Sequence, residues 1–98
     1  MIVLTAKYKA LPGMRDKILE VAAPCVAATR QEKGNLEYTL YLSGEDPDGI
    51  LCFERWENAA CLQAHGTQPH YKAFGEARKP LFDPESFQLN VYQVEDKQ

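Results

Sequence analysis

The chain has 98 residues, 45% hydrophobic and 26% charged, and these ordinary globular values predict one folded domain over residues 1–98. The formal net charge is −3 and the basic residues are scattered singly, whereas a nucleic-acid-binding protein concentrates them on one face. No apolar run approaches the roughly 20 residues that cross a bilayer, and three cysteines without a C-x-x-C pair predict a cytoplasmic protein with reduced thiols.

The N-terminal third of the chain predicts a strand followed by a helix. Residues 2–9 (IVLTAKYK) are rich in β-branched side chains and alternate roughly, which is typical of a strand. Apolar residues then recur at steps of three and four over residues 14–29, which predicts one buried helix face. Pro24 lies inside that pattern and cannot donate to the carbonyl of Glu20, so we expect a kink or a short break there. Gly34 ends the helix.

The rest of the chain predicts three more strands and two short helices. Residues 36–42 alternate with period two, which predicts a strand with one dry face, and residues 50–56 form its hairpin partner. Two short helices follow, the first capped by Asn58 and the second by Thr67. The last strand is expected at residues 87–94.

The order of these elements indicates an α+β fold. Strand, helix, strand, strand, split helix and strand make the ferredoxin-like β-α-β-β-α-β arrangement, a four-stranded antiparallel sheet with helices on one face. The opposite face of the sheet carries bulky apolar side chains that the helices do not cover. We therefore expect this face to pack on a second copy, giving a homodimer.

Residues 54–71 hold the only tryptophan and both histidines of the chain. The segment "ERWENAACLQAHGTQPHYKAF", which begins at residue 54, resembles the signature segment of the antibiotic-biosynthesis monooxygenase (ABM) family, in its quinol-monooxygenase-like branch. Residues 32–38 (EKGNLEY) resemble the turn into the second strand of the same family. The resemblance implies a dimeric α+β barrel, in which each subunit keeps a pocket between sheet and helices.

The resemblance also implies a choice of reactions. The family includes cofactor-free oxygenases of quinols and anthrones, haem-degrading enzymes and an isomerase of a phosphorylated furanone, so fold alone does not select one. The quinol branch implies a small aromatic substrate and O₂, with no cofactor and no metal, because the substrate supplies the electrons. The protein then has to bind a flat ring and remove a phenolic proton.

Helix position predicts different roles for the two histidines. His70 lies in the first turn of the second short helix, where the helix dipole disfavours imidazolium, so we expect it to be the catalytic base. His65 ends the preceding helix, where the dipole favours the charged form, and is predicted to donate to a developing oxyanion. Both assignments depend on helix position alone.

Four further residues are predicted to contact the substrate. Trp56 and Glu54 share one face of their strand by period two, so Trp56 could form a pocket wall and Glu54 could orient a histidine. Alternatively, Trp56 is a core aromatic and Glu54 an ion-paired or solvated carboxylate. Tyr71 and Phe74 are predicted either to stack on the substrate or to belong to the core.

Other kinds of site are weaker interpretations of the same segment. Cys61 and His65 share a helix face at i and i+4, but two ligands do not make a metal site and no metal is predicted. The cysteines are interpreted as small hydrophobic residues rather than nucleophiles. Haem-degrading relatives have an asparagine on the first strand and an additional tryptophan after the third, and this chain has neither at those places.

Two alternatives to a quinol oxygenase stay open. An isomerase of a small phosphorylated dione would use the same imidazoles for enolisation, with Lys72, Arg55 and Arg78 available for the phosphate. A non-catalytic dimer that binds a small molecule is the other alternative. Oxygen consumption would separate the first class from the other two.

Overall fold

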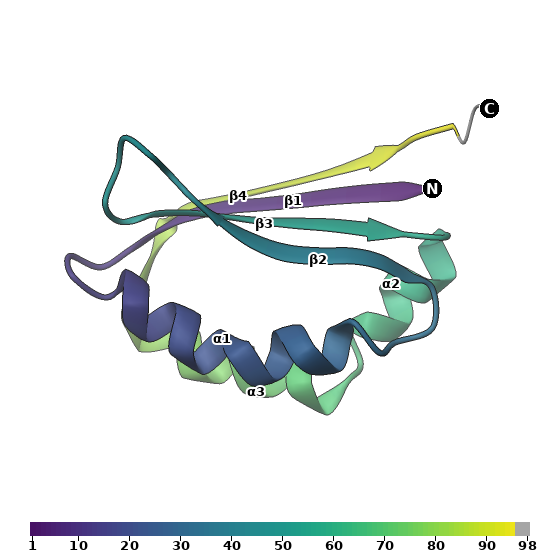
Figure 1. Cartoon of the computed structure of the whole chain (residues 1–98), viewed down its shortest axis with the longest axis horizontal. Coiled ribbons are helices and arrows are strands. Elements are labelled where there is room, and N and C mark those ends of the chain that lie inside the picture. Colours follow the sequence, from purple (N-terminus) through teal and green to yellow (C-terminus); the bar gives the residue numbers. More distant parts are fainter. Residues whose placement is uncertain (96–98) are drawn as a thin grey trace.

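The computed structural model describes residues 1–95, so the last three residues of the predicted domain lie outside the described part. Four strands, three α-helices and one 3₁₀ turn follow one another in the predicted order (Figure 1). They are β1 Ile2–Ala10, α1 Arg15–Thr29, β2 Asn35–Leu42, β3 Gly49–Trp56, α2 Ala59–His65, α3 Pro69–Arg78, η1 Lys79–Leu81 and β4 Phe82–Gln93.

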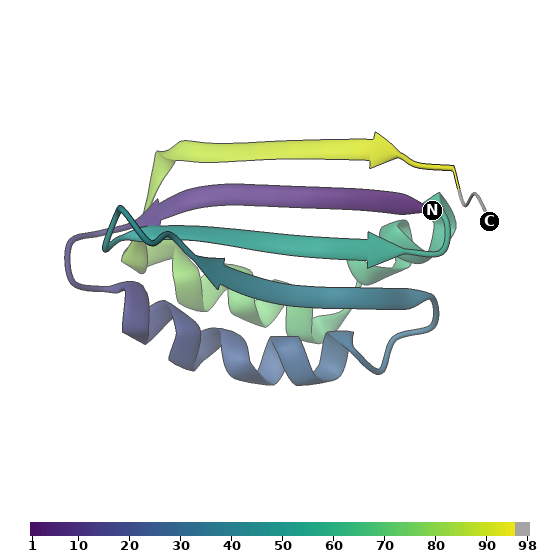
Figure 2. The same ribbon diagram turned by 45° about the horizontal axis from the view of Figure 1, so that its top comes forward.

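The strands form one antiparallel sheet in the order β2-β3-β1-β4. Helices α1 and α3 lie side by side on one face of this sheet, and α2 lies at one end (Figures 1 and 2). This is the ferredoxin-like α+β arrangement, so the predicted fold class is confirmed. None of the helices in residues 1–95 is long and apolar enough to cross a membrane.

Strict alternation along β3 sets which side chains face the helices. Every second residue from Ile50 to Trp56 is buried, and the residues between them are half-buried. Glu54 pairs with Leu4 of β1 and Cys52 pairs with Ala6, so these four side chains share the inner face of the sheet. The period-two pattern in the sequence correctly put Glu54 and Trp56 on one face of the strand, and the structure shows that this face is the buried one.

Helix α1 runs through Pro24 without interruption, so the expected break does not occur. Its buried face carries residues spaced by three and four, as the sequence predicted: Ile18, Ala22, Cys25 and Thr29. Pro24 and Glu20 are both exposed, so water can bind the Glu20 carbonyl that proline leaves without an amide partner. The helix therefore tolerates this proline because it lies on the solvated side.

Two predicted boundaries differ from the structure. Thr67 does not cap α3: its hydroxyl donates to the Ala64 carbonyl at 2.7 Å, and Gln68 occupies the N-cap position. The last strand begins at Phe82 rather than at residue 87, because the chain pairs with the end of β1 across an irregular step in the ladder. Periodicity alone does not reveal the part of a strand that lies beyond such an irregularity.

Candidate active site

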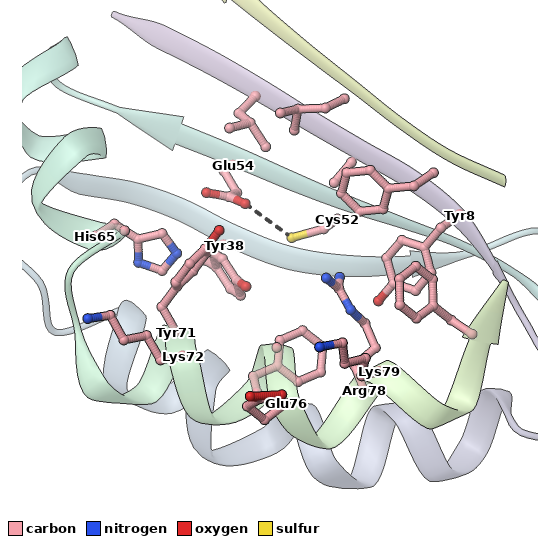
Figure 3. A pocket seen from close by; sticks show the side chains of 18 of the residues that line it. Tyr8, Tyr38, Cys52, Glu54, His65, Tyr71, Lys72, Glu76, Arg78 and Lys79 are labelled. Carbon is pink, nitrogen blue, oxygen red and sulfur yellow. Dashed lines mark hydrogen bonds between the residues drawn. The ribbon is translucent and has the colours of Figure 1, made fainter. Parts of the chain in front are cut away.

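A cavity of about 760 Å³ opens between the inner face of the sheet and α3, a volume typical of small-molecule sites (Figure 3). Strand β3 contributes Glu54 and Cys52, and α2 contributes His65 at its last position. Aromatic side chains from α3 and β4, among them Phe74 and Phe87, complete much of the wall. The lining thus combines flat apolar surface with a few polar groups, which is the composition of a site for an aromatic ligand.

His65 is held by a carboxylate from the turn after α1. Its Nδ1 lies 2.6 Å from Oε2 of Glu32, and the His65 side chain is only 4% exposed. Since a carboxylate only accepts, Nδ1 carries a proton, and in the neutral imidazole Nε2 is then the acceptor. Nε2 is buried and has no hydrogen-bond partner among residues 1–95. The cavity wall therefore includes a buried, oriented imidazole with a free basic nitrogen.

His70 binds the same oxygen atom from the other helix. Its Nε2 lies 2.7 Å from Oε2 of Glu32, and the ring centroids of His65 and His70 are 6.0 Å apart. The two predicted histidines are thus brought together by one carboxylate. Among residues 1–95, however, the cavity lining includes His65 and not His70.

Glu32 is the residue that sequence reasoning missed. It follows α1 in a tight turn, where its amide donates to the Thr29 carbonyl at 3.0 Å, and Gly34 two positions on adopts a left-handed φ of 82°. A charged residue in a turn has no periodic pattern to single it out. The one available signal was its place in "EKGNLEY", the second segment that resembles the ABM family.

Trp56 supports the cavity from behind rather than forming its wall. The indole is fully buried, and its Nε1 donates to Oε1 of Glu54 at 3.0 Å. Its ring centroid lies 5.0 Å from that of His65. Trp56 is therefore a core aromatic residue, which was the alternative considered from the sequence. It contacts two residues of the cavity wall, Glu54 and His65, without being among the lining residues itself.

Glu54 lies in the cavity wall with a carboxyl group that is mostly buried. Burial raises its pKa, and the hydrogen bond from Trp56 offsets part of that rise. The Cys52 thiol also donates to Glu54, at 3.5 Å. From the sequence, Glu54 was predicted to orient a histidine. In the structure, the carboxylate that binds the histidines is that of Glu32.

Tyr71 and Phe74 both line the cavity, but they do so differently. Tyr71 is 47% exposed, and its ring meets the His65 ring edge-on with centroids 5.0 Å apart. Phe74 is 8% exposed and belongs to the core cluster as well as to the lining. Tyr71 is thus free to contact a ligand at the mouth, whereas Phe74 forms part of the floor.

The thiols of the core are arranged for packing. Cys25 and Cys52 are buried, and burial together with the charge of Glu54 raises the pKa of the Cys52 thiol. A buried thiol of this kind stays protonated and is a poor nucleophile. The interpretation of these cysteines as small hydrophobic residues agrees with their surroundings.

One cluster of side chains has the donor types for a divalent metal. The ligand atoms of Glu32, His65 and His70 all lie within 4.8 Å of one another. The two nitrogen-to-oxygen separations, 2.6 and 2.7 Å, are those of direct hydrogen bonds to one carboxylate oxygen, Oε2 of Glu32. Cys61, the sulfur ligand considered from the sequence, lies against Gly34 instead.

The fold and this site define a class: a ferredoxin-like protein with an internal aromatic cavity and a carboxylate–imidazole group suited to proton transfer. Residues 1–77 match the family described as antibiotic biosynthesis monooxygenase. The chain belongs to that family, which confirms the resemblance found in its sequence. Family membership and the relatives support a monooxygenase-like function.

Individual relatives span nearly the same length. YcnE of Bacillus subtilis (strain 168) is 30% identical over 95 residues, covering 97% of each chain. "Probable quinol monooxygenase YgiN" of Escherichia coli (strain K12) is 32% identical over 89 residues, covering 81% of this chain and 86% of its own. A conserved protein from Methanosarcina mazei Go1 has the same fold, with a TM-score of 0.89, 22% identity and coverage of 96% and 92%.

Proposed function

We propose that this protein is a cofactor-independent monooxygenase that oxidises a small aromatic quinol or anthrone with O₂. The observation that carries the proposal is the buried, unpartnered Nε2 of His65 on the wall of an aromatic cavity. A base placed beside a bound flat ring can remove a phenolic proton. The name of the YgiN relative, a probable quinol monooxygenase, points to the same substrate class.

In this proposal His65 is the base and Glu32 positions it. Glu32 fixes the tautomer with Nε2 free, and its charge stabilises the imidazolium that forms when Nε2 takes the proton. His70 binds the other side of the same carboxylate and holds it in place. These roles replace the ones suggested by helix position, because His65 lines the cavity, whereas His70 contacts Glu32 and is not among the lining residues.

The substrate anion provides the electrons for the rest of the reaction. Loss of the proton makes the ring electron-rich enough to reduce O₂. One oxygen atom then forms a bond to the ring carbon, and the other leaves as water together with the two hydrogens that the substrate loses. The protein contributes an apolar slot and the proton transfers, and the step requires no further reductant.

We also propose that the functional unit is a homodimer formed through the outer face of the sheet. No helix of residues 1–95 covers this face (Figures 1 and 2). It carries half-buried or exposed apolar side chains, and the ring of Tyr41 packs edge-on against Phe53, with centroids 6.4 Å apart. Tyr41 and Tyr92 are 49% and 50% exposed, so a second copy would bury considerable aromatic area.

Isomerisation of a small phosphorylated dione is the second candidate. Lys72 and Arg78 both line the cavity and could bind an anionic group there. Arg55, the third cation considered, pairs with Glu37 at 2.9 Å on the other face of the sheet and takes no part in the cavity. Enolisation would use the same His65 nitrogen without consuming O₂.

The deciding experiment is oxygen uptake by the purified protein across a panel of naphthoquinols and anthrones. The oxygenase proposal expects substrate-dependent uptake above the rate of spontaneous oxidation, and one labelled atom in the product when ¹⁸O₂ is supplied. Turnover of a phosphorylated dione without oxygen uptake would favour the isomerase. Uptake no faster than without protein over the whole panel would overturn the oxygenase proposal.

A further inference from the structure

The end of the cavity away from His65 is built around one arginine. The guanidinium carbon of Arg78 lies 4.7 to 5.4 Å from four aromatic ring centroids. Those rings belong to Tyr8, Phe74, Phe82 and Phe87. Figure 3 shows the guanidinium extending from α3 into the cavity beside Tyr8. A cation enclosed by ring faces is stabilised by them, and its N–H groups remain available in its own plane.

This arginine has no anionic partner within the described chain. Its Nε is buried and makes no hydrogen bond to any of residues 1–95, and no carboxylate among them lies within ion-pair distance of it. Glu76 also lines the cavity, but it forms no such pair with Arg78. Arginine cannot lose its proton in a protein, so the buried donor stays charged and unsatisfied.

A second unsatisfied donor lies beside the first. Tyr8 is 1% exposed, and none of residues 1–95 accepts a hydrogen bond from its hydroxyl. Burial raises the pKa of Tyr8, while the Arg78 side chain, through its close N–H groups and its positive charge, lowers it in part. The hydroxyl therefore keeps its proton and can donate it to an acceptor. Two buried donors that share one end of a cavity are costly unless water or a ligand supplies the acceptor, and the acceptor groups of a ligand can satisfy both at once.

The two chemically distinct ends of the cavity are far enough apart to bind different parts of one ligand. Glu54, beside His65, pairs with Leu4 on β1, and Tyr8 is four residues further along the same strand. At about 3.3 Å per residue, that separates the two ends by roughly 13 Å along the strand. Ala6, which lies between Leu4 and Tyr8 on β1, lines the cavity between the two ends.

We propose that Arg78 and Tyr8 form a carboxylate subsite, so that the cavity takes a fused-ring aromatic acid. The carboxylate would accept from Arg78 Nε and the Tyr8 hydroxyl, and the rings would lie against the aromatic wall. A carboxylate matches the planar donor edge of a guanidinium better than a bulkier anion does. The orientation of the reacting hydroxyl towards His65 rests on the proposed function, whereas the subsite itself does not.

Binding of a matched pair of inert probes tests the subsite. We would titrate 2-naphthoate and its neutral analogue 2-naphthamide into the full-length protein by isothermal titration calorimetry. The naphthoate should bind at least about 10-fold more tightly, which corresponds to 1.4 kcal/mol. Equal affinity for the two probes, or binding of neither, would overturn the proposal. Because neither probe is oxidised, the result is independent of whether the protein consumes O₂.

Variants then show which residues cause the preference for naphthoate over naphthamide. Arg78→Met keeps the apolar stem but removes the charge and donors, so it should abolish the preference for naphthoate; Arg78→Lys should retain part of it. Tyr8→Phe should reduce the preference by a smaller factor. Lys33→Met makes the same change of charge at an exposed residue outside the cavity lining and should leave the preference intact. An unchanged preference in Arg78→Met, with circular dichroism like that of the wild type, would contradict the assignment.

Discussion

Glu32 and His65 are 33 positions apart in the sequence, yet their side chains meet at 2.6 Å. The carboxylate comes from the turn after α1 and the imidazole from the last residue of α2. The same carboxylate oxygen also meets His70, at 2.7 Å. This contact determines which nitrogen of His65 is free, and it is therefore the basis of the proton transfer proposed above.

The first prediction concerns Glu32. Glu32→Gln keeps the shape of the side chain, but an amide can also donate, so His65 is no longer held in one tautomer and its imidazolium loses a countercharge. Turnover should fall by about 10²–10⁴-fold, with a much smaller change in KM. The rate of oxygen uptake, measured over a range of quinol concentrations up to saturation, gives both turnover and KM. Glu85→Gln removes an exposed carboxylate and should have wild-type kinetics; similar kinetics in both variants would contradict the positioning role.

The second prediction ranks the two histidines. His65→Asn keeps a donor for Glu32 and removes the free acceptor, so turnover should fall by about 10²–10⁴-fold. His70→Asn should cost less, because His70 acts only through Glu32. Steady-state turnover of the two variants shows which histidine matters more, provided that their circular dichroism spectra match and both are therefore folded. The opposite ranking would restore His70 as the base, as helix position alone predicted.

The third prediction is a pH dependence of stability that comes from Glu54. Its pKa is raised in the folded protein by burial, so between the ordinary value and the raised value the folded state binds more protons than the unfolded chain. Stability should therefore decrease as pH rises through that window. Glu54→Gln has no proton to lose and still accepts from Trp56, so its stability relative to wild type should increase with pH.

Urea unfolding at a series of pH values measures this difference. Glu85→Gln, the exposed control, should give a difference from wild type that is flat with pH. Parallel stability curves for Glu54→Gln and wild type would show that the Glu54 carboxyl group has the same pKa in both states.

The fourth prediction separates two costs of replacing a glycine. Gly34 has a φ of 82°, and an added Cβ would overlap the Cys61 side chain, at 2.8 Å from its Cβ. Gly13 has a φ of 79° with nothing within 4 Å of an added Cβ. Gly13→Ala should therefore cost only the backbone strain, about 1–2 kcal/mol. Gly34→Ala should cost about 1–3 kcal/mol more, because the added methyl group also overlaps the Cys61 side chain.

Free energies of unfolding from urea titrations provide both values. Equal losses in the two variants would mean that Cys61 moves aside at little cost. Since Gly34 fixes the turn that carries Glu32, Gly34→Ala should also lower turnover, whereas Gly13→Ala should not.

The fifth prediction concerns the oligomeric state. Sedimentation equilibrium at micromolar concentration should give twice the chain mass of 11.1 kDa. Phe53→Lys places a charge on the outer face of the sheet and should shift the protein towards monomer. Leu11→Lys makes the same kind of change at an exposed residue of the loop after β1 and should remain dimeric. A stable wild-type monomer would refute the proposed dimer.

Much of the fold followed from local patterns. Period-two alternation located β3 and put Glu54 and Trp56 on one face, and steps of three and four located the buried face of α1. These signals work because the spacing at which side chains return to one face, every second residue in a strand and every three to four in a helix, is a property of the backbone itself. They failed at the start of β4, because Phe82 and Asp83 pair with β1 beyond an irregular step in the ladder that depends on the neighbouring strand.

The sequence by itself determined the element order, the family and the two histidines as candidates. Only the tertiary structure decided that Glu32 joins them, that His65 and not His70 reaches the cavity, and that Arg78 lies unpaired among four rings. The physical reason is that these relationships are contacts between side chains far apart in the chain. Packing of helices on the sheet creates them, and no periodicity along the sequence records them.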